Sequence, residues 1–298
     1  IDHRLLAFEA VLQEGGFERA ARRLALTQSA VSQRVKLLEA ELGQVLLVRS
    51  KPVRPTPAGR RLLPYLAQLR LMEAEARRAL SPRQVDGPLR LAVGVNADSL
   101  ATWFIGAVAE VVRDEGIVLD CVVDDQDHTH ALLADGEVLG CVSTRADPIR
   151  GCAAMRLGTM PYLCAGSPAF RAHWFPHGLT PAALARAPAI VFGHHDDMHE
   201  AFLLRHFGLD ARRYPHHVVP SSEGFMAFAV AGLGYGFIPE IQARAHVARG
   251  ELVDLAPERE EVVLYWHHWQ VQSPVMARLA RAIGDAAGNA LTSPTPAA

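Results

Sequence analysis

Residues 27–43 read TQSAVSQRVKLLEAELG, and this stretch decides the fold of the amino-terminal part of the chain. Its first turns hold the short or polar residues Ser29, Ala30, Ser32, Gln33 and Arg34, whereas leucines dominate its end. A surface helix ordinarily carries one apolar stripe along its whole length. The leading end of this helix is therefore predicted to contact something other than the protein's own core.

Two further helices are predicted before this stretch. Residues 2–15, DHRLLAFEAVLQEG, place apolar side chains near helical period and end at Gly15 and Gly16. Residues 17–26, FERAARRLAL, predict a second short helix, and Thr27 is a candidate N-cap for the third. A short helix, a tight connection and a second helix form a helix-turn-helix, whose second helix lies in the major groove of DNA.

The side chains of the third helix and of the segments on either side of it divide into three predicted groups. Arginine and glutamine make paired hydrogen bonds to guanine and adenine, so the base-reading candidates are Gln28, Ser29, Ser32, Gln33 and Arg34. Basic residues that anchor to phosphates carry no sequence information, and the candidates are Arg22, Arg23, Lys36, Arg49, Lys51 and Arg54. Spacing of three or four residues predicts that the helix is held to the core by Val31, Val35, Leu38 and Leu42. Residues 45–59, VLLVRSKPVRPTPAG, read as a β-wing.

The charge distribution agrees with a nucleic-acid-binding head. Residues 1–83 carry 15 Lys and Arg against 8 Asp and Glu, whereas residues 84–298 carry 15 against 24. A basic head on an acidic body indicates that only the head meets a polyanion. The chain lacks a run of 18 apolar residues and a signal-peptide layout, and its four cysteines show no CxxC spacing. We therefore expect a cytoplasmic, reduced protein with no membrane partner.

Residues 57–80 predict one long helix that leaves the head. Leu62, Leu66, Leu69, Glu73, Ala76 and Leu80 alternate steps of four and three residues, as in the seam of a coiled coil. Pro64 falls in the early turns, where a proline is either tolerated or kinks the helix. We expect this helix to pair two subunits, and SPRQVDGP (81–88) to form a hinge.

The remainder of the chain alternates strands and helices. Apolar runs at 89–95, 117–123 and 138–144 predict buried strands, with helices between them. The theme repeats after residue 160, with strands expected at 162–167, 189–193, 216–220 and 262–269 and a closing helix at 274–290. Such alternation predicts an α/β sheet, and two such lobes form a clamshell around a cleft.

The head resembles the DNA-binding domain of LysR-type transcriptional regulators. The pattern is carried by Phe17, Ala20, Ala21, Leu24, Gln28, Ala30, Ser32, Leu38, Glu39, Leu42, Gly43, Leu46, Arg49, Thr56 and Gly59. The departures are Ser29, where the family often has proline, and Leu47, where it usually has phenylalanine. The resemblance implies an α+β multidomain protein that binds a pseudo-palindromic operator in double-stranded DNA as a homodimer or homotetramer.

The same resemblance implies three domains. A winged helix-turn-helix spans residues 1–57, and a linker helix with its hinge spans residues 58–87. A two-lobed α/β effector domain, similar to periplasmic binding proteins, spans residues 88–298. Its first lobe comprises about 88–160 with 267–298, and its second about 161–266.

The cleft of this body is predicted to bind a small effector. Ligands sit beyond the carboxyl ends of parallel strands, and helix N-termini there attract carboxylates. Two helix starts and one strand end supply caps, hydroxyls and acids: Asp98, Ser99, Ser143, Thr144, Ser222 and Glu223, with Asp124 and Asp197 nearby. Hydroxyl and N–H groups for a carboxylate, together with acids for a cation, suit a basic amino acid.

The strings NADSLATW (96–103), DDMHEAFL (196–203) and LYWHHW (264–269) also resemble the branch of the family that senses lysine and arginine and controls amino-acid export. That resemblance implies ligand contacts from Ser99, Ser143 and Ser222. The acid that meets the ligand's side chain stays open among Asp124, Asp197 and Glu223. Activation or repression, and lysine or arginine, also stay open.

Three alternatives compete with this interpretation. HDDMH (195–199) places His195 and His199 four residues apart, as in zinc sites, so a metal-sensing regulator or a metal-dependent enzyme is possible. A regulator that senses a different small ligand is the third option. No GxSxG, P-loop or GxGxxG motif occurs, so we predict a protein that is not an enzyme and that needs no cofactor or metal.

Overall fold

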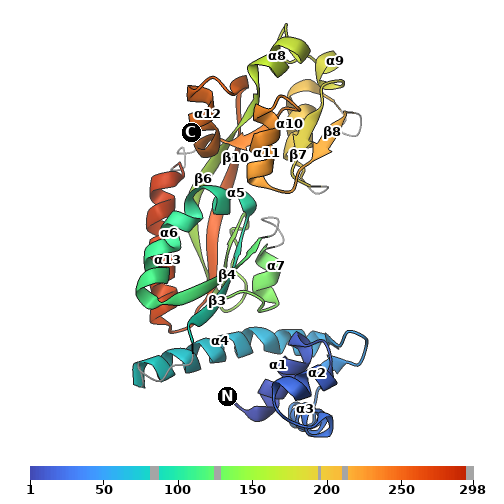
Figure 1. The fold of residues 1–298 in the computed structure, drawn as a ribbon, viewed down its shortest axis with the longest axis vertical. Helices are drawn as coiled ribbons and strands as arrows, with labels where there is room; N and C mark the ends of the chain where they lie inside the picture. Colours follow the sequence, from blue (N-terminus) through green and yellow to red (C-terminus); the bar gives the residue numbers. More distant parts are fainter. Residues whose placement is uncertain (81–86, 124–128, 194–195, 210–213, 293–298) are drawn as a thin grey trace.

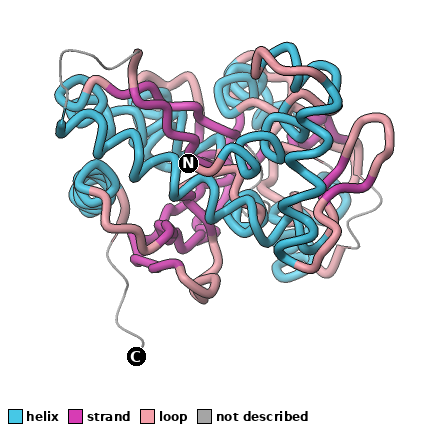
Figure 2. The backbone as a smooth tube through the Cα atoms, turned by 90° about the horizontal axis from the view of Figure 1, so that it is seen from below, coloured by secondary structure: helices cyan, strands magenta, loops and turns pink. Residues whose placement is uncertain are grey.

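The computed structural model describes residues 1–80, 87–123, 129–193, 196–209 and 214–292. Figure 1 shows an elongated molecule in which a helical head and one long helix lie at one end of a larger body. Seen from below, the helices dominate the view and the strands of the body run between them (Figure 2). Over the described residues, no helix combines the length and apolarity needed to cross a lipid bilayer.

The head is a winged helix-turn-helix, as predicted. It contains α1 (His3–Gln13), α2 (Phe17–Arg23) and α3 (Gln28–Leu42), followed by the antiparallel pair β1 (Leu47–Val48) and β2 (Arg54–Pro55). Its core includes Phe8, Val11, Val31 and Val35, each at most 1% exposed. The predicted core position of Leu42 is wrong, because the last turn of α3 lies outside the core and leaves Leu42 47% exposed.

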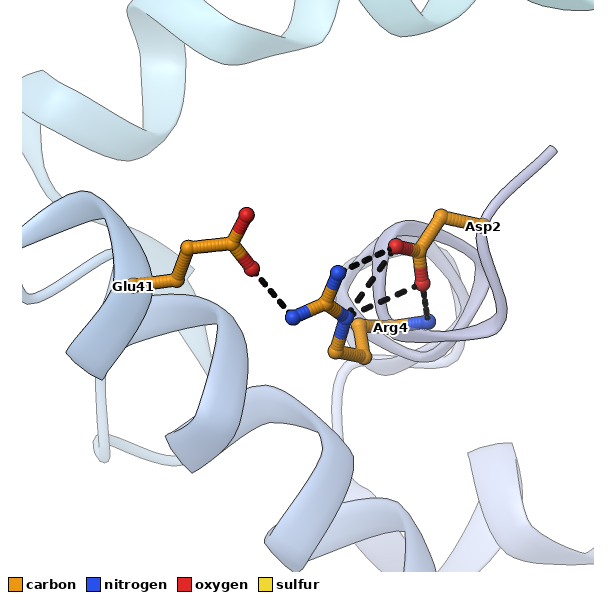
Figure 3. A network of polar contacts seen from close by, with 3 residues as sticks. All are labelled: Asp2, Arg4 and Glu41. Carbon is orange, nitrogen blue, oxygen red and sulfur yellow. Dashed lines mark hydrogen bonds and ion pairs between the residues drawn. The ribbon is translucent and has the colours of Figure 1, made fainter.

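An ionic network joins the start of α1 to the end of α3 (Figure 3). The carboxylate of Asp2 caps α1 by accepting from the backbone N–H of Arg4 at 2.7 Å, and it also accepts from the Arg4 guanidinium at 2.6 Å. The same guanidinium pairs with Glu41. Hydrogen bonds from Arg4 lower the pKa of Asp2 to about 2, so the cap stays ionised at neutral pH.

Helix α4 (Pro57–Leu80) connects the head to the body as a single helix that includes Pro64. Proline lacks the backbone N–H that a helix interior would use. The backbone of Gly136 lies directly against Pro64, since a Cβ on this glycine would lie 2.4 Å from the Pro64 nitrogen. Leu66 packs in the core of the head, whereas Leu71 packs in the core of the body. The helix is thus shared by both parts.

Two polar contacts fasten the carboxyl half of α4 to the body. The hydroxyl of Ser273 donates to the Glu75 carboxylate at 2.7 Å, and the Val275 N–H donates to it at 3.2 Å. Arg78 donates to the backbone carbonyls of Glu115 at 2.9 Å and of Gly116 at 3.3 Å. The two contacts cap the N-terminus of one body helix and the C-terminus of another.

The body is built on a six-stranded mixed sheet in the order β4-β3-β5-β10-β6-β9. The strands are β3 (Leu89–Val95), β4 (Ile117–Val123), β5 (Gly140–Ser143), β6 (Cys152–Gly166), β9 (Gly236–Pro239) and β10 (Val253–Trp269). Strand β3 runs parallel to β4 and β5, whereas β10 is antiparallel to β5 and β6. The strands β6 and β10 begin earlier than the sequence predicts, because each pairs with the other along almost its whole length.

Helices and a small second sheet cover this frame. They are α5 (Ala97–Ser99), the π-helical turn η1 (Leu100–Phe104), α6 (Ile105–Glu115), α7 (Thr129–Ala134), α8 (Pro168–Trp174), α9 (Pro181–Leu184), α10 (Met198–Phe207), α11 (Ser222–Val230), α12 (Glu240–Ala248) and α13 (Pro274–Ala290). The parallel strands β7 (Ala189–Val191) and β8 (His216–Val218) form the second sheet. Figure 1 shows α6 and α13 side by side along the large sheet, where their apolar faces enclose the core around Trp266. The predicted two-lobed α/β body is confirmed in its elements; the domain boundaries stay predictions, and the predicted hinge lies largely outside the described residues.

Gly59 generates a prediction about the packing of α4 on the wing. A Cβ at this position would lie 2.2 Å from the backbone oxygen of Leu46, so we expect Gly59→Ala to destabilise the protein by about 1–3 kcal/mol through overpacking. Gly106 lies in α6 with open space around it, and Gly106→Ala should be neutral or slightly stabilising. Urea unfolding of both variants checks this; equal midpoints would contradict the close packing at Gly59.

Candidate functional site: an exposed helix end and an acidic cavity

The amino-terminal half of α3 is accessible along the face predicted to read DNA. The Thr27 hydroxyl accepts from the Ala30 N–H at 3.2 Å and starts the helix. Val31, Val35 and Leu38 hold α3 against the head. The predicted reading side chains lie on the other face: Gln28, Ser29 and Gln33 are exposed, and Ser32 and Arg34 are partly exposed. Each of these five side chains is therefore at least partly accessible in the described chain, as contact with a double helix requires.

The basic side chains predicted to contact phosphates lie around the same helix. Lys36, Arg49, Lys51 and Arg54 are exposed on α3 and the wing. The guanidinium carbon of Arg49 lies 5.4 Å from the centroid of the Phe17 ring, which orients it beside α2. Arg23 instead pairs with Glu14 at 3.2 Å, and Arg22 lies 3.9 Å from Glu18. Among the described residues, the basic side chains of the wing therefore have fewer acidic partners than those of α2.

A cavity of about 220 Å³ lies in the body between α5 and the starts of α10 and α11. Its walls come from elements far apart in the sequence: Asn96 and Asp98 at α5, Tyr162 in β6, Phe192 after β7, and His199 in α10. Further lining residues are Ala97, Ile190, Asp196, Asp197, Met198, Ser222, Phe225, Phe237, Ile238, Pro239 and Gln242. The site is thus assembled by the fold rather than by one motif.

Asp98 forms the central polar contact of the cavity. One carboxylate oxygen accepts from the Tyr162 hydroxyl at 2.7 Å, and the other accepts from the Ser222 hydroxyl at 2.7 Å. Burial raises the pKa of Asp98, and the nearby carboxylates of Asp196 and Glu223 act in the same direction. A cation in the cavity would stabilise the ionised form of this group.

The other charged groups of the lining are also acidic. The Asp196 carboxylate accepts from the backbone N–H groups of Phe192 at 2.9 Å and Met198 at 3.2 Å, which fixes it before α10. Asp197 is exposed at the cavity edge. Among the described residues that line the cavity there is no lysine or arginine. The lining therefore favours a cationic ligand.

His199 lies in the first turn of α10 and is 2% exposed. Its Nε2 lies 3.2 Å from the Tyr235 hydroxyl. Burial, followed by the neighbouring His216, lowers the pKa of His199 to about 3, so the ring is neutral at physiological pH. His195, its predicted metal partner, lies outside the described residues. Within the described ranges no group of three or more His, Cys, Asp or Glu side chains is placed to hold a metal ion.

The structure brings together three of the predicted effector residues: Asp98, Asp197 and Ser222 line the cavity. The other described candidates are not part of its lining. Ser99 and Ser143 are fully buried, Thr144 follows β5, and Glu223 is exposed and accepts from Ser221 at 3.2 Å. Asp124 lies outside the described residues. The roles of all these side chains, in DNA binding and in effector binding, stay predictions.

Sequence reasoning missed the aromatic part of the cavity. Phe192 directly follows β7, so the rule that ligands lie beyond strand ends gives a signal for it. Tyr162 lies within β6 and Phe225 within α11, where each reads as an ordinary core residue. Nothing in the local sequence distinguishes them from the core.

Comparison with known proteins matches both the head and the body of the chain to one family. The family described as "Bacterial regulatory helix-turn-helix protein, lysR family" matches residues 3–60, and "LysR substrate binding domain" matches residues 82–288. The HTH-type transcriptional regulator ArgP of Aeromonas salmonicida is 47% identical over 274 residues, covering 91% of this chain and 92% of that protein.

Two solved structures share the whole architecture. ArgP from Mycobacterium tuberculosis has a TM-score of 0.88 and 39% identity, covering 98% of this chain and 99% of that chain. Full-length LysG from Corynebacterium glutamicum with the bound effector Arg has a TM-score of 0.82 and 36% identity, covering 98% of each chain. The resemblance seen in residues 17–59, and that to the lysine- and arginine-sensing branch, are thereby confirmed. The chain belongs to the LysR family of bacterial transcriptional regulators.

Proposed function

We propose that this regulator acts in the cytoplasm as a homodimer or homotetramer and binds a pseudo-palindromic operator. In this proposal a basic amino acid, lysine or arginine, occupies the body cavity and changes the affinity for the operator. The protein is a binding protein and not an enzyme. The observation that carries the effector assignment is the cavity lining, in which the carboxylates of Asp98, Asp196 and Asp197 face no lysine or arginine among the described residues.

Operator reading is assigned to the exposed start of α3. Gln28, Ser29, Ser32, Gln33 and Arg34 face solvent at least in part, and their donors and acceptors match base edges in the major groove. Lys36, Arg49 and Arg54 are assigned to phosphates, which position the head without reading sequence. The buried residues Val31 and Val35 keep α3 fixed while its free face enters the groove.

The effector's carboxylate and its cationic groups are assigned to different groups of the cavity lining. The ligand's carboxylate is assigned to the start of α11, where the N–H groups of the first turn and the positive end of the helix dipole favour an anion. The ammonium or guanidinium groups are assigned to the carboxylates, led by Asp98. The LysG structure, whose bound effector is Arg, supports this ligand class for a chain of the same fold.

Dimer formation is assigned to the free face of α4. Tyr65, Leu69, Met72 and Leu80 are 60%, 43%, 47% and 84% exposed, and the first three follow one another at heptad-like steps of four and three. The prediction that Leu66 lies on the seam is wrong, because Leu66 packs in the core of the head. Exposed apolar stripes of this kind are typical of helix pairing. A second copy paired here would place two α3 helices in one particle, as an operator with two half-sites requires.

A continuous helical run offers a route from the cavity to the head. Residues 97–115 form α5, η1 and α6 without a break. Asp98 lies in the first turn of this run, and the carbonyls of Glu115 and Gly116 at its end accept from Arg78 of α4. The π-helical turn at Leu100–Phe104 is a geometry that often marks functional positions. We infer that the effector shifts the population of α4 orientations through this run.

The DNA assignment predicts different losses for two arginines. Arg34→Ala should weaken operator binding by about 1–3 kcal/mol and relax the base preference, since a paired contact to guanine is lost. Arg49→Ala should weaken binding to all sequences alike and reduce the salt slope by about one. Fluorescence anisotropy with operator and scrambled duplexes measures both. Equal losses on the two duplexes for Arg34→Ala would remove its reading role.

The effector assignment predicts a pH-dependent affinity. Because the pKa of Asp98 is raised, acidification through that pKa should protonate the carboxylate and weaken the binding of arginine or lysine. Asp98→Asn should raise the Kd about 10- to 100-fold at neutral pH and flatten this pH dependence. Calorimetric titration at several pH values tests both statements, with glutamate as the non-binding control. An unchanged Kd in the Asn variant would exclude Asp98 from the site.

The coupling assignment predicts a variant that binds both ligands but does not connect them. Arg78→Ala should leave the Kd for arginine and the effector-free operator affinity within about two-fold, while the effector-induced change in operator affinity shrinks. Arg77→Ala is the matched control, because the Arg77 side chain is 74% exposed and pairs, among the described residues, with Glu73 of the same helix. A full effector response in Arg78→Ala would refute this route.

A further inference from the structure

We propose that His199 determines the specificity of the cavity by accepting a hydrogen bond, through Nδ1, from the side-chain nitrogen of the bound amino acid. The inference rests on the proposed function, because it assigns a role within the same cavity. It adds a recognition group that is not an acid. The sequence presents this histidine only as half of a zinc-like pair.

The ring of His199 is held in place by its neighbours. It lies 4.9 Å from the Tyr214 ring, 5.1 Å from the Tyr235 ring and 5.8 Å from the Phe237 ring, measured between centroids. It lines the cavity together with Asp196 and Asp197, which precede it at the start of α10. A side chain packed on three rings has little freedom to turn away from a ligand.

Within the part of the chain that the structure describes, one nitrogen of the His199 ring has no hydrogen-bond partner. A neutral imidazole has one donor nitrogen and one acceptor nitrogen, and burial keeps His199 neutral by lowering its pKa to about 3. Its Nε2 lies 3.2 Å from the Tyr235 hydroxyl, whereas its Nδ1 is buried and has no hydrogen-bond partner among the described residues. A buried polar atom in this condition is costly, so a ligand that pairs with Nδ1 gains affinity.

The charges around the cavity decide which role Nδ1 takes. Beside His199, a ligand carboxylate would be repelled by Asp196 and Asp197, whereas an ammonium or guanidinium group is attracted by them. Such a cation brings three or five N–H donors and therefore needs acceptors. With Nε2–H donating to Tyr235, Nδ1 carries a lone pair and supplies one. A neutral acceptor adds direction to the contact without adding charge.

The consequence is a preference for ligands with a correctly placed side-chain N–H donor, which attraction between charges alone does not provide. Lysine and norleucine have side chains of nearly the same shape, but only lysine carries terminal N–H donors. The carboxylates attract any cation, whereas Nδ1 rewards a donor only at one position and in one direction. Removing this acceptor should therefore reduce the preference for lysine over norleucine and leave the recognition of the ligand's backbone groups intact.

The test is calorimetric titration of the full chain with arginine, lysine and norleucine, with competition titrations for weak ligands. His199→Phe keeps an aromatic ring and removes both nitrogens. We expect about 10-fold or greater loss for arginine and lysine and a change within about two-fold for norleucine. His199→Gln retains an acceptor oxygen and should keep most of the affinity. Tyr214→Phe retains the ring beside His199 and is the control, expected to bind all three ligands as the native protein does.

Two results would overturn the inference. One is native affinity for arginine and lysine in His199→Phe, and the other is an equal loss for all three ligands, which indicates a structural role. Should His199→Phe fail to fold by circular dichroism, Tyr235→Phe decides, because it releases Nε2 and should reduce the lysine-to-norleucine ratio; an unchanged ratio overturns the proposal. A native protein that binds neither basic amino acid refutes the proposed function itself, which is a separate outcome.

Discussion

The pairing of β6 with β10 is the constraint on which the body depends. These two antiparallel strands run together from Val253 opposite Gly166 to Trp269 opposite Cys152. Strand β5 pairs with the carboxyl-terminal end of β10, and β3 and β4 continue the sheet beyond β5. Strand β9 pairs with the carboxyl-terminal part of β6. Both walls of the cavity are therefore attached to one ladder. A register slip in that ladder would invert the faces of the strands and separate the walls.

The cavity keeps a carboxylate in a place where burial opposes its charge. Asp98 is held by hydroxyls from Tyr162 of β6 and Ser222 of α11. These neutral donors satisfy its oxygens but bring no positive charge, and Asp196 lies close enough to raise its pKa further. A site of this kind is pre-organised for a cation, because a cationic ligand supplies the positive charge that stabilises the ionised Asp98 carboxylate. The neutral ring of His199 extends the same logic, since it offers an acceptor without adding a fourth negative charge.

The head and the body are joined by contacts as well as by the chain. Helix α4 places Leu66 in the head core and Leu71 in the body core. Glu75 caps the start of α13, and Arg78 caps the end of α6. The long helices α6 and α13 pack together along the sheet (Figure 1). The cavity wall at α5 and the contact with α4 lie at opposite ends of one continuous helical run. A rearrangement at α5 can therefore be transmitted along this run to α4.

The sequence by itself determined the parts whose signal is local. The polar start and apolar end of residues 27–43 predict the helix-turn-helix and its exposed face, because helical periodicity and capping act over a few residues. Helix caps likewise pointed to Asp98 and Ser222, and Asp197 was predicted as an acid near them. Tertiary structure alone decided the rest. Tyr162, Phe192 and Phe225 join the cavity only when distant strands pair, and Ser143 and Glu223 stay out of its lining for the same reason. The lengths of β6 and β10, and the exposure of Leu42, depend on partners remote in sequence, which no local pattern encodes.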